Sequence, residues 1–163
     1  MPVTPDHDLT YPNPDDAPNG PRQVQQLALD VDQALTGLLV DTGVQAGLDV
    51  TPAAGWQVTA RQYRLIGKKM YLRLETQRTG ANITADTTGA GNAPGNIADT
   101  VIATINDVQL RPAFDTYGLF RGSITSGSCQ VGADGRVWIV DMHSNSSIRT
   151  NDTVNISMPY PIP

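Results

Sequence analysis

The chain has 163 residues, of which 17% are charged and 6% aromatic, and its formal net charge at pH 7 is −5. This length allows one ordinary domain, or a domain of roughly 100 residues with appendages, but no second enzyme-sized domain. The acidic balance argues against general nucleic-acid binding, which usually depends on a basic domain.

The composition favours turns and short strands. The sequence contains 15 glycines and 12 prolines, which favours a β-rich chain over a large helical core. Cys129 is the single cysteine, so neither an intrachain disulfide nor a zinc site of several thiolates is expected. The N-terminus lacks the pattern of a signal peptide, and no stretch approaches the roughly 18 apolar residues of a membrane span. We therefore expect synthesis in the cytoplasm without a signal peptide and without membrane insertion.

The first 20 residues contain five prolines and four aspartates but neither lysine nor arginine. Such a segment buries too little apolar surface to offset the entropy of ordering it. We expect residues 1–20 to form an extended arm that is ordered only where it lies on something else. It is either a frayed terminus or an attachment peptide.

Residues 21–42 are expected to form a helix. Asn19 and Gly20 are suitable caps, Pro21 fits the first helical position, and Gly43 is a plausible stop. Its apolar residues recur at nearly heptad spacing, as in a coiled coil: Val24, Leu27, Ala28, Val31, Ala34, Leu35 and Leu38. The helix is therefore either a short self-associating stalk or an amphipathic helix packed on its own domain. About two and a half heptads cannot hold copies together unaided, so a stalk needs help from C-terminal residues.

Residues 43–55 are expected to form a linker, because glycines and a proline recur in this stretch. A β domain over residues 56–163 should follow. Within residues 69–74, Met70, Leu72 and Leu74 alternate with polar and aromatic positions, which indicates a strand with one buried face. Gly67-Lys68 predicts a hairpin turn that pairs residues 63–66 with residues 69–74.

The rest of the β domain has the same character. Residues 79–96 are low in complexity and predict an exposed loop or a strand with a long irregular flank. Residues 97–105 are apolar enough to be buried, as a strand or as a helical turn. Further strands are expected within residues 119–124, 128–131, 136–142 and 153–160, with a tight turn at 133–136. Short antiparallel strands at even spacing are typical of a sandwich or a small barrel.

Six of the 11 basic residues lie within 18 positions of one another. On a hairpin they form either a solvated face or a basic band that binds an acidic partner, such as the aspartate-rich arm or an anionic polysaccharide. The six residues are Arg61, Arg64, Lys68, Lys69, Arg73 and Arg78.

Residues suited to catalysis are few. His143 lies in Asp141-Met-His-Ser144, but on a strand Asp141 and His143 point to the same side and Ser144 points away. The sequence has no Gly-x-Ser-x-Gly elbow, no calcium-binding loop and no phosphate loop. We therefore expect no catalytic residues, no metal site and no cofactor, and we treat His143 as an exposed histidine at a strand end.

Several of these segments together resemble the small minor tail and fibre-like proteins of tailed bacteriophages, especially those that infect actinobacteria. The resemblance covers most of residues 10–160 and is carried by short motifs: Pro18-Asn-Gly-Pro21 before the helix, Trp56, Arg64-Leu-Ile-Gly-Lys-Lys-Met-Tyr-Leu72, Arg111-Pro112, Ala133-Asp-Gly-Arg-Val-Trp-Ile139 and Val154-Asn-Ile-Ser-Met-Pro-Tyr160.

The resemblance implies a homotrimeric virion protein that is not an enzyme. Three helices would form a stalk, three antiparallel β-sandwich heads would pack around the same axis, and the arms would dock on other virion proteins through Leu9, Tyr11 and Pro12. Such a protein would belong to the tail tip or baseplate, where its head could meet a bacterial surface glycan. Two alternatives stay open: a trimeric capsid decoration protein or head fibre, and a hydrolase of cell-wall glycan.

Overall fold

The computed structural model describes residues 20–85 and 95–163, and the chain divides after Asp41 into two units. The first unit contains helix α1 (Gly20–Leu39). The helix begins where the Asn-Gly-Pro sequence predicts, but it ends at Leu39, three residues before the expected end at residue 42. Gly43, the expected stop, has a φ of 62° and lies four residues beyond the helix. Over residues 20–85 and 95–163, no helix is both long and apolar enough to cross a membrane.

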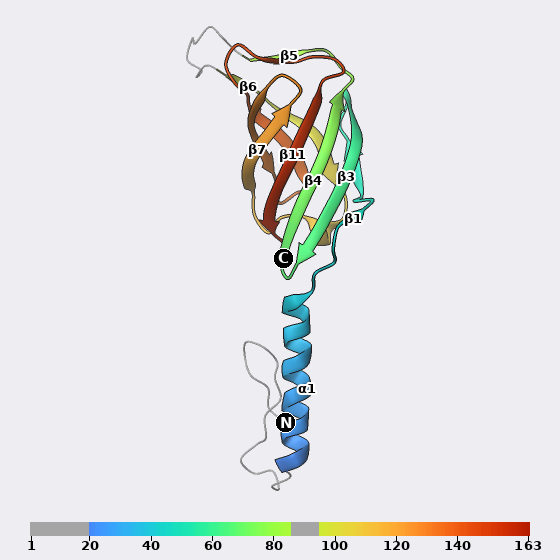
Figure 1. Cartoon of the computed structure of the whole chain (residues 1–163). Helices are drawn as coiled ribbons and strands as arrows, with labels where there is room; N and C mark the ends of the chain where they lie inside the picture. The colour runs from blue at the N-terminus through green and yellow to red at the C-terminus, as the bar shows by residue number, and fades with distance from the viewer. Residues whose placement is uncertain (1–19, 86–94) are drawn as a thin grey trace. The chain divides into compact units, whose positions relative to one another are not determined.

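The second unit is mainly β, as the sequence predicts, and is built on one antiparallel sheet of nine strands (Figure 1). The strand order is β1-β3-β4-β11-β7-β8-β9-β6-β2. The strands are β1 (Gln45–Ala46), β2 (Val50–Pro52), β3 (Trp56–Ile66), β4 (Lys69–Arg78), β6 (Asn96–Ile105), β7 (Thr116–Gly122), β8 (Ser126–Val131), β9 (Arg136–Asp141) and β11 (Thr153–Pro161).

Two short strands, β5 (Ile83–Thr84) and β10 (Ser147–Ile148), pair separately from this sheet. Of the two alternatives for residues 79–96, the described part favours a strand within an irregular segment, because Ile83–Thr84 is paired and Ala85 is buried. Residues 86–94 lie outside the described part. Residues 97–105, for which strand and helical turn were both open, belong to strand β6.

The large sheet curls (Figure 1). Buried apolar side chains from its strands form the core. Along β4, Met70, Leu72 and Leu74 are fully buried while Tyr71 and Arg73 between them are exposed. The predicted hairpin is confirmed, since residues 63–66 of β3 pair with residues 69–72 of β4. Alternation of this kind gives the sheet an apolar inner face and a polar outer face.

A short 3-10 helix (Val108–Leu110) is joined to the core by a buried hydrogen bond. The hydroxyl of Tyr160 on β11 donates to the carbonyl oxygen of Leu110 at 2.9 Å. Burial raises the pKa of the Tyr160 phenol well above its ordinary value.

The structure differs from the expected linker at residues 43–55. This stretch contributes β1, which pairs with β3, and β2, which pairs with β6. Leu48 and Val50 are buried in the core of the β unit. The glycines at 43, 47 and 55 all have positive φ, so they mark turns between short strands rather than a flexible connection.

Candidate functional site

The apolar stripe predicted on the helix is exposed to solvent in the single chain. Val24 is 68% exposed, Leu27 43%, Val31 37% and Leu35 49%. Ala28 is also exposed, and Ala34 is half-buried. These residues fall on one side of an α-helix because they follow the three- and four-residue spacing of a single face. The side chain of Leu38, and the predicted docking residues Leu9, Tyr11 and Pro12, lie outside what the structure describes.

The opposite side of the helix carries polar residues that bond to one another. Gln26 donates to the carboxylate of Asp30 at 2.8 Å, and the Thr36 hydroxyl donates to the carbonyl oxygen of Asp32 at 2.8 Å. Leu29 lies away from the stripe and is 56% exposed. The helix is thus amphipathic, and its apolar face is exposed.

The structure brings together only part of the predicted basic band. Arg64 on β3 is paired with Tyr71 on β4, and Arg73 is paired with Gln62, so these side chains share the outer face of the hairpin with Lys69. Lys68 lies in the hairpin turn. Arg73 donates to the amide oxygen of Gln62 at 3.3 Å.

Part of this face is a shallow depression of about 360 Å³, whose lining includes Gln62, Arg64, Tyr71, Arg73, Val44 and Ile66 but neither Lys68 nor Lys69. Its exposed aromatic ring is Tyr71, and its charged groups are Arg64 and Arg73. We call this surface the basic face; it consists of Arg64, Lys68, Lys69, Tyr71 and Arg73.

Two of the predicted cations are separated from this face. Arg61 is paired with Leu74, whose side chain is buried, so Arg61 lies on the other side of the hairpin and lines a groove along the edge of β3. Arg78 lies over the Trp56 ring, 5.0 Å from its centroid, and donates to the carbonyl oxygens of Ala81 at 2.8 Å and Gly55 at 3.2 Å. Arg78 therefore stabilises the fold rather than presenting its charge to a partner.

A second concave surface lies on the outer face of β6, β8 and β9. It is a groove of about 440 Å³, and its lining includes an aromatic ring, an amide and three carboxylates: Trp138, Gln130, Asp99, Asp115 and Asp134. We call it the Trp138 groove. In the sheet Trp138 is paired with Gln130 of β8 and with Val101 of β6. Its neighbours Val137 and Ile139 are fully buried, so the pleat turns the indole outward.

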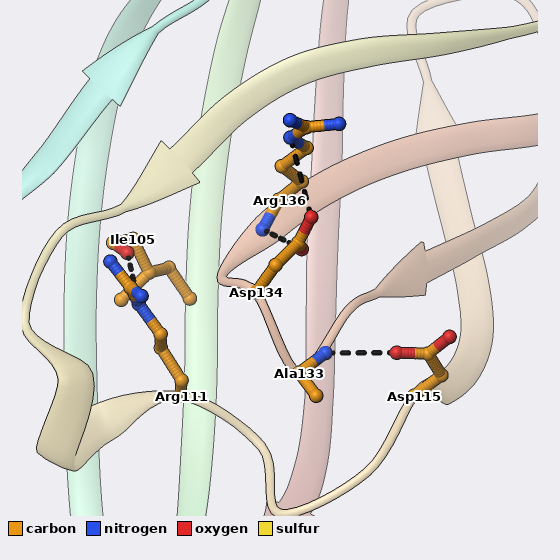
Figure 2. Close-up of polar contacts among 6 residues, drawn as sticks. All are labelled: Ile105, Arg111, Asp115, Ala133, Asp134 and Arg136. Atoms are coloured by element: carbon orange, nitrogen blue, oxygen red, sulfur yellow. Dashed lines mark hydrogen bonds and ion pairs between the residues drawn. The ribbon is translucent and has the colours of Figure 1, made fainter.

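Two of the carboxylates are fixed by the turn between β8 and β9 (Figure 2). Asp115 accepts a hydrogen bond from the backbone N–H of Ala133 at 2.9 Å. Asp134 accepts one from the N–H of Arg136 at 2.9 Å, and its other oxygen lies 3.3 Å from Nε of Arg136. The Arg136 guanidinium lies over the Trp138 ring at 5.9 Å from its centroid. These contacts fix the positions of Asp115 and Asp134 beside the Trp138 ring.

The turn itself is braced from the other side. The N–H of Ile105 donates to the carbonyl of Gly135 at 2.8 Å. Arg111 Nε donates to the carbonyl of Ile105 at 3.0 Å (Figure 2). A Cβ at Gly132 would lie 2.7 Å from Oδ1 of Asp134, so a larger residue there would displace this carboxylate. The carboxylates are therefore positioned before any ligand binds.

The Trp138 groove was not predicted from the sequence. One signal in the sequence bears on it, since Trp138 alternates with Val137 and Ile139 and so belongs to the outer face of a strand. Asp99 and Asp115, by contrast, lie far from Trp138 in the sequence, and only the strand order brings them to it.

Asp141 and His143 make separate contacts. Asp141 accepts a hydrogen bond from the N–H of Ser128 at 2.8 Å, and Nδ1 of His143 donates to the carbonyl of Ser144 at 2.8 Å. Cys129 is buried, and burial raises the pKa of its thiol to about 11. In the described part of the chain, no group of three His, Cys, Asp or Glu side chains is arranged to hold a metal ion.

No model of a known protein family matches this sequence, and no curated protein matches it either.

Proposed function

We propose that this protein is a homotrimeric structural protein of a bacteriophage virion, a minor tail protein of the tail tip or baseplate whose head meets the host surface. Three copies of α1 form a short stalk, and three β-sandwich heads built on the curled sheet pack around the same axis. The phage assignment rests on the sequence motifs that resemble minor tail proteins.

The observation that carries the proposal is the exposed apolar stripe of α1. An isolated helix of 20 residues is marginal in water, and burial of an apolar face supplies most helical stability in proteins. Val24 and Val31 stand seven residues apart, and Leu27 and Leu35 lie between and beyond them. This is the spacing with which identical helices pack their side chains into one another.

The head offers a second exposed apolar feature. Leu119 on β7 is 77% exposed, although its neighbour Phe120 is buried in the core. Its partner in the sheet is Ser128, a small polar residue that does not cover it. Contact between heads through Leu119 would supply the additional stability that a stalk of about two and a half heptads needs.

The location is tested on purified particles. An epitope tag after Pro163 and gold labelling should place the protein at the tail tip, whereas capsid labelling would favour a decoration protein. Deletion of residues 1–18 should leave a folded trimer that no longer joins the particle, because the arm is proposed to carry Leu9, Tyr11 and Pro12 to their binding site. Incorporation at normal copy number would contradict this role of the arm.

A further inference from the structure

The Trp138 groove combines features that suit a sugar. Its concave surface contains hydrogen-bond acceptors, which are carboxylate and amide oxygens, and the aromatic ring of Trp138. Aromatic rings pack against the C–H faces of sugar rings, while carboxylate and amide oxygens accept hydrogen bonds from hydroxyl groups. Sites for small ligands typically have this character, with an aromatic or apolar wall and a few fixed polar groups.

The Trp138 groove and the basic face differ in the sign of their charge. Asp99, Asp115 and Asp134 all line it, and the neighbouring cation Arg136 is held by Asp134 at 3.3 Å. An anionic polymer would meet three carboxylates here and be repelled. The groove therefore selects a ligand that has many hydroxyl groups and no negative charge.

The polar groups are also organised in advance. Asp115 uses Oδ1 to hold Ala133, and no donor within residues 20–85 and 95–163 bonds to its Oδ2. Gln130 stands beside Trp138 in the sheet register and carries both a donor and an acceptor. Binding then costs little reorganisation at Asp115 and Asp134, because the turn has already fixed these two carboxylates.

We propose that the Trp138 groove binds neutral oligosaccharide, with Trp138 packing against a sugar ring and with Asp115 and Gln130 bonding its hydroxyl groups. This inference deepens the proposed host-surface contact and rests on it for its biological role. The sequence suggests that an anionic polysaccharide binds the basic face. The proposed site instead lies on β8 and β9, where the charged groups of the groove are carboxylates and the ligand is uncharged. A peptide fits less well, because Trp138 is the one large apolar side chain among the groove's lining residues.

The test uses the full-length chain on immobilised neutral oligosaccharides of glucose, galactose, mannose and N-acetylglucosamine. Heparin, polygalacturonate and an oligolysine peptide are measured in parallel. We expect binding to at least one neutral oligosaccharide, weakened at least about tenfold by Trp138→Ala, which is the scale of one aromatic contact. Asp115→Asn should also weaken it, because the amide replaces one acceptor oxygen by a donor.

Tyr71→Ala is the matched control, since it removes an exposed aromatic ring from the basic face. It should leave neutral-sugar binding unchanged. The inference would be overturned if no neutral sugar bound, or if Tyr71→Ala weakened binding as much as Trp138→Ala does. It would also be overturned if the protein preferred heparin, or if oligolysine were the only probe whose binding depended on Trp138. Native mass and thermal unfolding are recorded for every variant. If the protein is a trimer but binds no sugar, only the proposed binding site is wrong. If the protein is a monomer, the proposed assembly is wrong.

Discussion

The hydroxyl of Tyr160 on the last strand donates a buried hydrogen bond to the carbonyl oxygen of Leu110, and so joins residues 50 positions apart. Tyr160→Phe would remove the donor and leave this carbonyl without its partner. We expect a loss of about 1–3 kcal/mol of unfolding free energy, the usual cost of an unsatisfied buried group. Urea denaturation measures it, with the exposed Tyr71→Phe as control. Equal stability of the two variants would show that the bond contributes nothing.

Alkaline pH should destabilise the β unit. Burial raises the pKa of Cys129 from 9.0 to about 11, so the folded state keeps a proton that the unfolded chain loses. The contribution is therefore complete below pH 9 and is lost as pH rises towards 11. Its size is on the order of 3 kcal/mol, at about 1.4 kcal/mol per pKa unit over the rise from 9.0 to about 11.

The buried Tyr160 phenol, whose pKa is also raised, should extend the same decline to higher pH. Denaturation at a series of pH values measures the slope, and Cys129→Ala should flatten it between pH 9 and 11. An unchanged slope in that variant would mean that the thiol does not titrate in this range.

Arg78 and Arg73 provide a test of which cations serve the fold. Arg78→Gln removes the contact with Trp56 and bonds to Ala81 and Gly55, so we expect a loss of about 1–3 kcal/mol of unfolding free energy. Arg73→Gln, on the exposed outer face, should change stability by less than about 0.5 kcal/mol. Thermal unfolding of both variants checks this. If Arg78→Gln and Arg73→Gln changed the unfolding free energy equally, the contacts of Arg78 would contribute no more to stability than an exposed arginine does.

Leu119 should contribute to assembly and not to the fold of one subunit. Its side chain is 77% exposed, so Leu119→Ser should leave the unfolding of the isolated head unchanged. If heads meet there, the variant trimer should dissociate at a protein concentration at least about tenfold higher than the wild type, equivalent to about 1.4 kcal/mol. Analytical ultracentrifugation over a dilution series measures this, and an unchanged dissociation curve would remove Leu119 from the interface.

The sequence predicts the parts of the fold that depend on local pattern. Alternation around Met70 and Leu72 gives strand β4, and Gly67, with a φ of 56°, gives the hairpin turn. Recurring glycines in residues 43–55 predict a linker, whereas the structure has two short strands there. Leu48 and Val50 are buried only through pairing with distant strands, which glycine spacing does not reveal.

The candidate sites follow the same division. The apolar stripe of α1 is periodic, so the sequence specifies it directly. The predicted basic band includes more residues than lie on one face of the hairpin. Residues on a strand alternate between faces, and a bulge between Val58 and Ala60 changes the register near Arg61. The Trp138 groove depends on the meeting of β6, β8 and β9, which no local pattern encodes.

The measurement that tests the assembly most directly is the native mass of three proteins: the wild type, Val31→Asp and Leu29→Asp. Both variants place a carboxylate on an exposed position of α1, but only Val31 belongs to the apolar stripe. At micromolar concentration we predict three times the chain mass of 17.4 kDa for the wild type and for Leu29→Asp, and monomer or aggregate for Val31→Asp. A wild-type protein of 17.4 kDa, or a trimer that survives Val31→Asp, would contradict the stalk.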